Sequence, residues 1–466
     1  MLRRSASTIT IPHLACPPSQ PHPLAFVIFQ RHGDRAPAGQ LFDDRPTSFT
    51  SEESGLGELG GVFLKSSSNP REKRYFAPPS PSPSPLSLSS FATSTTKISN
   101  EKSYWSSAIS SPSLVDTSPF PVDRQQSLQS WPSSPATFID DKNPPFGHLT
   151  RFGAEQLRSV GHHFRSTLRF NPSQWDVTCV STNYLRTVTS AQNFLHGLYN
   201  FDEIKIKTQS FPKIEIRPPA SCTLNAYDRD PKLMKSLVKA VKESALWTES
   251  PDTGGRKHEE NSEVWQAVLA RFFDGREFLS EKHDGDAADA DDDVDVDVHW
   301  MHLFDHITSQ EYHGDGNKLL PSIFGNVPQG QFGKLASRVK KVLNTRFKLW
   351  YEDSRIIGQV GVPCLVEVRD VFEKAINEEN GLPPLWLFSA HDVTLLSVLY
   401  AIKADELLEI SNEKKKEKEG FWPPYASSVT FELSRDLLVT VKCNGRNVRS
   451  PFSIAEFDEM LNKVKI

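Results

Sequence analysis

Apolar residues in the first half of the chain form short continuous runs that alternate with runs of helical spacing. Leu24–Phe29 is an uninterrupted apolar run of strand length, which is typical of a strand buried on both faces of a sheet. Helical spacing follows over Gly153–Leu168 and Arg186–Leu198, and a short β-rich run, Asp176–Ser181, lies between them. This strand–helix–strand–helix order predicts a parallel α/β sheet.

The pattern then becomes mainly helical from about Pro231 to Tyr351, with no strand candidate in between. Four segments carry helical spacing: Leu233–Leu246, Val264–Phe273, His299–Tyr312 and Phe332–Trp350. We therefore expect residues 223–355 to form a smaller helical cap domain, inserted between an α/β core of residues 24–222 and its continuation over residues 356–466.

Strand and helix signals return in this last part. They predict a helix, a strand, a helix, the two strands of a hairpin, and a final helix: Leu365–Ile376, Leu385–Phe388, Val393–Ile402, Val429–Leu433, Leu437–Cys443 and Ser453–Val464. Ser453 and Glu456 have the spacing of a capping box. The predicted fold class is thus α/β, with a mainly parallel central sheet flanked by helices, an inserted helical cap and a C-terminal hairpin.

Two tracts of biased composition interrupt this pattern. Of the 13 residues Pro78–Ser90, 11 are Ser or Pro, and of the 14 residues Asp284–Asp297, 8 are Asp. The net charge of -5 comes from the second tract, since 53 basic and 50 acidic residues remain without those aspartates. We predict a disordered tail over residues 1–23, a disordered Ser/Pro-rich insertion over residues 43–145, and an Asp-rich surface loop over residues 284–297.

Several protein classes are disfavoured. No apolar run approaches the ~18 residues of a transmembrane helix, and no cluster of Lys and Arg with interleaved aromatic residues indicates nucleic-acid binding. The five cysteines are scattered and form no CxxC pair, which favours reduced thiols in an intracellular, most simply cytoplasmic, protein. The N-terminal segment contains Arg3 and Arg4 and no acidic residue, so a mitochondrial location is the alternative.

The segment Arg31-His32-Gly33-Asp34-Arg35-Ala36-Pro37 follows the first predicted strand, where open α/β sheets bind ligands. Guanidinium groups bind phosphate through two parallel hydrogen bonds and keep their charge. A histidine between two such cations is biased towards its neutral, nucleophilic form. The alternative is an ordinary charged surface turn.

Two further segments end predicted strands. Arg186 lies in the first turn of a predicted helix, where anions bind, although it could be an ordinary helix residue. His391 and Asp392 follow the strand Leu385–Phe388 and could supply an anion donor and a proton donor, or Asp392 could simply cap the next helix. Convergence of all three segments on one sheet edge favours an anion site.

A metal site has weaker support. His299, His302, Asp305 and His306 lie at helical spacings beside the Asp-rich tract. A solvated helix face is the simpler interpretation, and no metal or other cofactor is expected.

The heptad Arg31–Pro37, with the later pair His391–Asp392, resembles the histidine acid phosphatases, the second branch of the histidine phosphatase superfamily. Similar matches occur along the chain, at Gly147–Gly153, Arg186–Thr187, Leu224–Asp228, Tyr312–Gly314 and Tyr425–Ser427. The cysteine pairs of the secreted members are not evident, and Asp230-Pro231 stands where a cysteine might be expected.

This resemblance implies a role for each matched residue. His32 would accept the phosphoryl group, Asp392 would protonate the leaving alkoxide, and four side chains would hold the phosphate: Arg31, Arg35, Arg186 and His391. Water would then hydrolyse the phosphohistidine, no metal would be needed, and the need for a protonated acid implies an acidic optimum. The expected partner is a small phosphorylated substrate: lysophosphatidate first, then an inositol polyphosphate or a sugar or glycan phosphate. A catalytically silent phospho-ligand binding module is the alternative from another class.

Overall fold

The computed structural model describes residues 23–36, 108, 118–124, 147–201, 211–250, 300–313, 329–378, 381–408 and 421–464. Within these residues, nine strands form one sheet: β1 (Ala25–Arg31), β2 (Val122–Arg124), β3 (Asp176–Ser181), β4 (Ile214–Ile216), β5 (Pro384–Ala390), β6 (Ser428–Leu433), β7 (Leu438–Cys443), β8 (Arg446–Asn447) and β9 (Phe452–Ser453). The order is β2-β4-β3-β5-β1-β6-β7-β8, with β9 also paired to β7. The five strands from β2 to β1 in this order run parallel, and β6 to β9 continue the sheet in antiparallel pairs.

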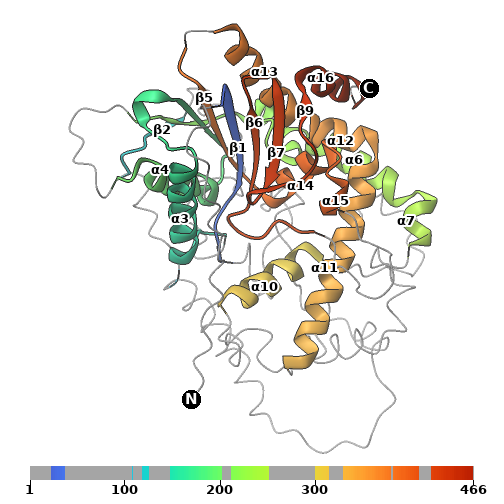
Figure 1. Cartoon of the computed structure of the whole chain (residues 1–466). Helices are drawn as coiled ribbons and strands as arrows, with labels where there is room; N and C mark the ends of the chain where they lie inside the picture. The colour runs from blue at the N-terminus through green and yellow to red at the C-terminus, as the bar shows by residue number, and fades with distance from the viewer. Residues whose placement is uncertain are drawn as a thin grey trace, which may run out of the picture.

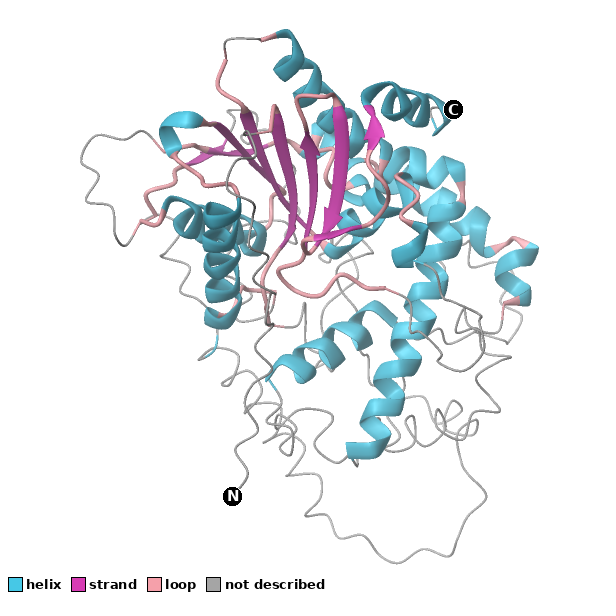
Figure 2. Cartoon of the chain, viewed as in Figure 1, coloured by secondary structure: helices cyan, strands magenta, loops and turns pink. Residues whose placement is uncertain are grey.

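Strand β1 lies inside the sheet, between β5 and β6, and all seven of its residues are buried. Its side chains alternate between two hydrophobic clusters: Phe26 and Ile28 join one, and Val27 and Phe29 join the other. The first cluster includes residues of α3 (Arg151–Thr167) and α4 (Leu185–Tyr199), and the second includes residues of α13 (Val362–Asn377) and α14 (Asp392–Ala401). Helices therefore cover both faces of the sheet (Figures 1 and 2), and the predicted α/β fold class is confirmed.

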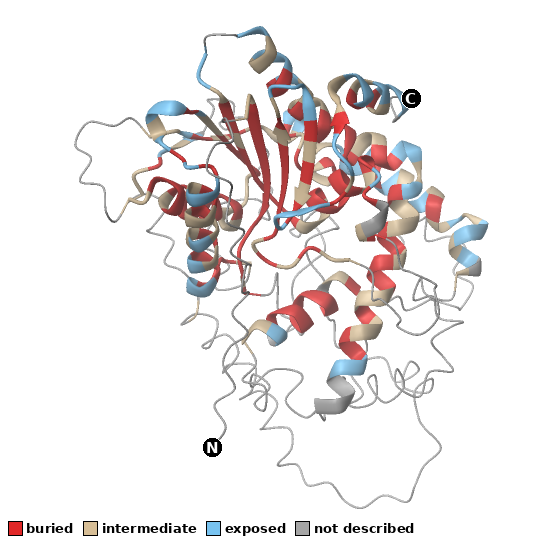
Figure 3. Ribbon diagram, viewed as in Figure 1, coloured by how far each residue is buried: buried red, intermediate tan, exposed pale blue. Residues whose placement is uncertain are grey.

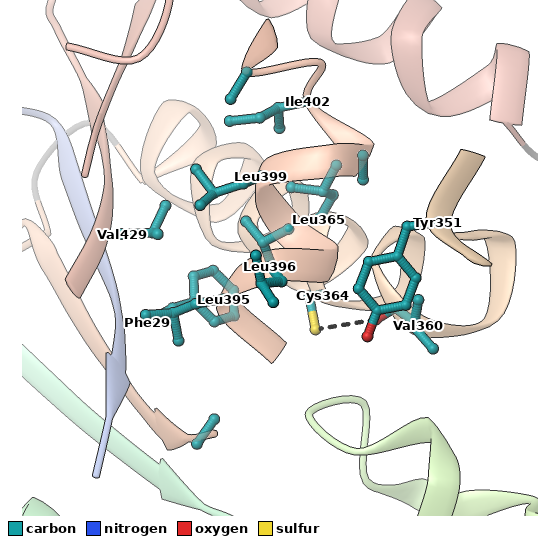
Figure 4. Packing of buried hydrophobic residues seen from close by; sticks show 14 of the residues in the cluster. Phe29, Tyr351, Val360, Cys364, Leu365, Leu395, Leu396, Leu399, Ile402 and Val429 are labelled. Atoms are coloured by element: carbon teal, nitrogen blue, oxygen red, sulfur yellow. Dashed lines mark hydrogen bonds between the residues drawn. The ribbon is translucent and has the colours of Figure 1, made fainter. Parts of the chain in front are cut away.

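The packing of α14 shows how tightly the second face is filled. Leu395 and Leu399 lie close to Phe29 of β1 and Val429 of β6 (Figure 4), and none of these four side chains is exposed. Burial runs through the central strands and the inner faces of the helices (Figure 3). The sheet is consequently a rigid support for the loops at its edge.

The remaining helices are α5 (Ala226–Arg229), α6 (Pro231–Lys242), α7 (Ala245–Glu249), α10 (Trp300–His313), α11 (Gln329–Glu352), α12 (Ser354–Val360), α15 (Asp405–Leu408) and α16 (Ile454–Val464). The single helix predicted over Leu233–Leu246 is two helices, because the Ser244 side chain caps α7. The predicted helix Val264–Phe273 lies outside the described residues. Leu303 of α10 and Val339 of α11 belong to the same hydrophobic cluster as Phe29, so the division into core and cap remains a prediction.

One part of the predicted insertion over residues 43–145 has regular structure. Residues Val122–Arg124 form β2 and pair with β4, and the side chain of Phe120 is fully buried beside Tyr199 and Phe211. The prediction of disorder is therefore wrong for residues 118–124, where two apolar side chains were masked by the surrounding Ser and Pro. The rest of the insertion, except residue 108, lies outside the described residues, as do residues 1–22 of the tail and the Asp-rich tract.

The C-terminal predictions are confirmed. Strands β6 and β7 form the antiparallel hairpin, and β6 also pairs with β1. In the capping box, the Ser453 backbone N–H donates to the Glu456 carboxylate, and the Glu456 backbone N–H donates to the Ser453 hydroxyl. No helix among the described residues combines the length and the apolar character needed to cross a membrane.

Candidate active site

The carboxyl ends of β1, β3 and β5 meet at one level of the sheet. Arg31 of β1 lies opposite Ala390 of β5, and Ser181 of β3 lies opposite Ser389. The ladder continues one residue beyond each strand, since the backbone N–H of His32 donates to Ala390 (3.0 Å) and that of Thr182 to Ser389 (3.1 Å). The three segments singled out in the sequence therefore emerge together at this edge.

The turn after β1 is fixed by close packing against α3. A Cβ on Gly33 would overlap the carbonyl oxygen of Gly153, so only glycine fits there. The next residue, Asp34, is fully buried and accepts hydrogen bonds from Thr150 and from its ion-pair partner His313 of α10. The direction of the His32 side chain thus depends on a turn held from both sides.

The contacts of His32 define its tautomer. Its Nδ1 lies 2.8 Å from the carbonyl oxygen of Gly33, and because a carbonyl only accepts, Nδ1 carries the proton. Burial lowers the pKa of His32 well below its ordinary 6.5, and the positive charges of Arg186, Arg31 and Arg35 lower it further. The ring is therefore neutral, with a lone pair on Nε2.

Three arginines lie around this imidazole, and in each of them an Nη atom has a partner in the protein. Nη1 of Arg31 donates to the Pro423 carbonyl and its Nη2 forms an ion pair with Asp392. Nη1 of Arg35 donates to Asp305, with Nη2 in ion-pair contact with the same carboxylate, and Nη2 of Arg186 lies 3.4 Å from His391 Nδ1. In each of the three, however, Nε is buried and has no hydrogen-bond partner. Three unpaired N–H donors in a buried site are the arrangement that an anion would satisfy.

His391 holds the third arginine. Because a guanidinium only donates, Nδ1 of His391 accepts from Arg186, and Nε2 then donates to the Thr182 hydroxyl at 3.1 Å. The ring of Tyr184 lies against both partners, 4.9 Å from the His391 ring and 4.3 Å from the Arg186 guanidinium carbon. Burial lowers the pKa of His391 well below 6.5, with Arg186 adding to the effect.

Asp392 begins α14 with its carboxylate directed at the arginines. Its Oδ2 lies 2.8 Å from Nη2 of Arg31 and accepts from the indole of Trp422 (3.2 Å), and its Oδ1 accepts from the backbone N–H of Val393 (2.8 Å). The interpretation of Asp392 as only a helix cap is incomplete, because the same carboxyl group forms an ion pair with Arg31. All six residues predicted from the sequence are thus brought together.

The sequence from residue 25 to residue 452 matches the family model of the histidine phosphatase superfamily (branch 2). The chain belongs to this branch of the histidine phosphatases. It is accordingly a phosphatase, and the resemblance seen in its heptad is confirmed.

Solved structures share the fold of this histidine phosphatase at low sequence identity. The multiple inositol polyphosphate phosphatase of Bifidobacterium longum, solved with inositol hexasulfate, is 14% identical with a TM-score of 0.52, and the match covers 97% of this chain and 94% of that one. The phytase of Citrobacter braakii is 14% identical with a TM-score of 0.47 over 96% of this chain and 98% of that one. A search of curated proteins found no match.

Some residues of the histidine phosphatase site were not assigned to it from the sequence, where Asp305 was noted only as a candidate metal ligand. Asp305 forms an ion pair with Arg35, and Tyr184 and Trp422 contact His391 and Asp392. Tyr425 lies under the guanidinium of Arg31, 4.4 Å from its carbon, and its hydroxyl is buried without a partner. The family-like segment Tyr425–Ser427 was the only available pointer to this last residue.

The candidate metal ligands lie on or next to α10, whose Asp305 pairs with Arg35. Asp305 and His306 are buried at 8% and 4% exposure, so the interpretation of a solvated face is wrong at these positions. Among the described residues, no group of three His, Cys, Asp or Glu side chains could hold a metal ion.

Four cysteines, Cys179, Cys222, Cys364 and Cys443, are buried and free of disulfides, and Cys16 is not described.

Proposed function

We propose that this phosphatase hydrolyses a phosphate monoester through a phosphohistidine on His32, with Asp392 as the general acid. The observation that carries the proposal is the set of unpaired Nε–H donors on Arg31, Arg35 and Arg186 around a neutral imidazole. A phosphate placed there meets three donors together with the lone pair of a nucleophile. Phosphoryl transfer depends mainly on positioning and charge stabilisation, and this site offers both.

In the first step, Nε2 of His32 attacks phosphorus, and the bond from phosphorus to the ester oxygen breaks. The hydrogen bond from Nδ1 to Gly33 supports the positive charge that forms on the ring. Asp392 gives its proton to the leaving oxygen, producing an alcohol. In the second step, Asp392 takes a proton from water as that water attacks phosphorus, which releases phosphate and restores His32.

Asp392 must be protonated before the first step, yet in the unliganded site it faces Arg31. A bound phosphate would compete for the Arg31 guanidinium and bring negative charge close to the carboxylate. The first step draws on the protonated form of a carboxyl group, which is more populated at low pH. We accordingly expect the rate to be highest at acidic pH.

The test is hydrolysis of an aryl phosphate by the full chain across the acidic range. We expect His32→Ala to lower kcat by at least about 10³-fold and Asp392→Asn by about 10²- to 10⁴-fold. Quenching with alkaline detergent during turnover of a ³²P-labelled substrate should leave alkali-stable, acid-labile phosphate on wild-type protein, on Asp392→Asn with a good leaving group, and not on His32→Ala.

A silent binding module is the competing function. It would bind inorganic phosphate through the same arginines without turnover of any substrate, and that result with folded wild-type protein would refute the esterase proposal. Lysophosphatidate, inositol polyphosphates and sugar or glycan phosphates form the panel for the leaving group. Lysophosphatidate stays a prediction from the sequence, and the panel includes inositol phosphates because of the proteins of similar fold.

A further inference from the structure

Arg35 differs from the other two arginines in having a carboxylate partner outside the matched motifs. Asp305 lies on α10, 270 residues away along the chain, and binds Arg35 through a hydrogen bond from Nη1 to Oδ2 at 2.9 Å and an ion-pair contact between Nη2 and Oδ1 at 2.8 Å. Both side chains are 11% exposed. An ion pair so shielded from water is more than a loose surface contact.

The donors of Arg35 can be counted. A guanidinium has five N–H groups, and Nη1 uses both of its own, one for Asp305 and one for the carbonyl of Ala36 at 3.0 Å. Nη2 is in ion-pair contact with Asp305, and Nε has no partner. The Nε–H and one N–H of Nη2 lie on the edge of the guanidinium that faces away from the Nη1–Nη2 end, and such an edge can take two oxygens of a phosphate side by side.

The charge of Asp305 also matters before a phosphate arrives. Burial opposes the charge of Arg35, but Asp305, with smaller effects of Tyr425 and Asp392, raises the pKa of Arg35 above its ordinary value. Arg186 shows the opposite balance: burial, followed by the charge of Arg35, lowers its pKa to about 10. Asp305 therefore helps the unliganded protein to keep three guanidinium groups close together.

We propose that Asp305 is a positioning residue of the phosphate site, which holds Arg35 with its Nε edge open to the substrate. This inference rests on the proposed function. Asp305 acts through Arg35 and does not touch the reacting atoms. It also gives the helical segment a part in catalysis, because the correct placement of α10 then determines whether the site is complete.

The test compares Asp305→Asn with wild type for aryl phosphate hydrolysis and for the binding of inorganic phosphate by calorimetry. We expect kcat/KM to fall about 10- to 100-fold, the usual scale for a misplaced catalytic contact, and the phosphate Kd to rise. Simple removal of a nearby negative charge would instead lower that Kd. An unchanged or lower Kd in Asp305→Asn would overturn the proposal.

A double-mutant cycle separates positioning from general stabilisation of the fold. Asp305→Asn added to Arg35→Ala should cause no further loss of kcat/KM, because the group it positions is already gone. Losses that add would contradict the proposal, even if Asp305→Asn alone lowers stability. The matched control is Glu311→Gln. Glu311 lies on α10, as Asp305 does, and this change removes its ion pair with Lys340 of α11 (3.0 Å). It should leave kcat/KM and the phosphate Kd unchanged.

Failure of the proposed function would be distinguishable. If folded wild type binds inorganic phosphate but hydrolyses no phosphate ester, the esterase proposal fails, and the positioning role is then decided by the Kd alone. A higher Kd in Asp305→Asn, with no further rise in the cycle with Arg35→Ala, supports the role. An unchanged or lower Kd in Asp305→Asn, or a further rise of the Kd when Asp305→Asn is added to Arg35→Ala, refutes it.

Discussion

The imidazoles of His32 and His391 lie among three guanidinium groups, a placement that keeps both rings uncharged. Each ring is buried, and burial is the largest cause of its lowered pKa, ahead of the charge of Arg186. In the folded protein these two histidines therefore stay neutral at pH values at which the unfolded chain protonates them. This difference couples the stability of the protein to pH.

The replacement His391→Asn tests this coupling. Below pH 6.5 the unfolded state protonates its histidines while native His391 stays neutral, so the native state loses stability as pH falls. Between pH 7 and 5.5, the free energy of unfolding should fall by on the order of 1 kcal/mol more in wild type than in the variant. Urea unfolding at the two pH values, in phosphate-free buffer, measures it, and an equal fall in both proteins would contradict the prediction.

Tyr425 carries a hydroxyl that the unliganded protein leaves buried without a partner. Tyr425→Phe should raise the free energy of unfolding by about 1 kcal/mol, because an unpaired buried donor is removed. We expect kcat/KM to fall in the same variant, the usual relation of stability to activity at a functional position. Chemical unfolding and steady-state kinetics are the measurements.

Tyr351 provides the matched control. Its hydroxyl is also buried, but it donates to the carbonyl oxygen of Val393 at 3.3 Å. Tyr351→Phe should therefore lower the free energy of unfolding by about 1 kcal/mol, opposite in sign to Tyr425→Phe. The same sign for both variants would show that the Tyr425 hydroxyl has a partner in the folded protein.

Helices α3 and α4 pack against each other at very short range. A Cβ on Gly161 would overlap the carbonyl oxygen of Phe194, and one on Gly197 would overlap that of Arg158. The two backbones are therefore in contact, each helix supplying one glycine. Because α4 begins at Leu185, this contact also determines where Arg186 lies.

Gly161→Ala should destabilise the protein by about 1–3 kcal/mol, since the added methyl group forces the helices apart. Gly333→Ala on α11 is the control: its Cβ meets no atom within 4 Å, and alanine should stabilise an exposed helix by about 0.5–1 kcal/mol. Thermal unfolding of both variants measures the difference. Equal effects would mean that the α3–α4 contact is loose.

Element by element, periodicity predicted long segments well and short ones poorly. Helices α3, α4, α13 and α14 lie within three residues of their predicted ends, because each buries most of its apolar side chains. Strands β2 and β4 have three residues each, too few to show a period, and are formed by pairing with each other and with β3. The break between α6 and α7 depends on the single side chain of Ser244.

The whole molecule assembles the site from distant segments: the end of β1, the start of α4, the start of α14, the segment around Trp422 and Tyr425, and α10. Three of these were predictable, because strand ends with Arg, His and Asp residues carry a local pattern. Asp305 was not, since its role arises from a contact across 270 residues that no local pattern records.

Phosphate should therefore stabilise the molecule globally. Inorganic phosphate at 100 times its Kd should raise the free energy of unfolding by about 2.7 kcal/mol. The Tm in phosphate, compared with chloride at equal ionic strength, measures this effect. Arg186→Ala should lose most of the shift, and an equal shift in that variant would place phosphate elsewhere.

The position of β1 has a consequence for biosynthesis. Its two neighbours pair with it from the far end of the chain, as in Phe26 with Leu385 and with Glu432. Strand β1, which leads into His32, thus leaves the ribosome about 360 residues before its first partner, which at 5–20 residues per second is roughly 20–70 s. During that time its apolar run has no sheet to join, so chaperone binding to the nascent chain is the step on which yield of the active enzyme should depend.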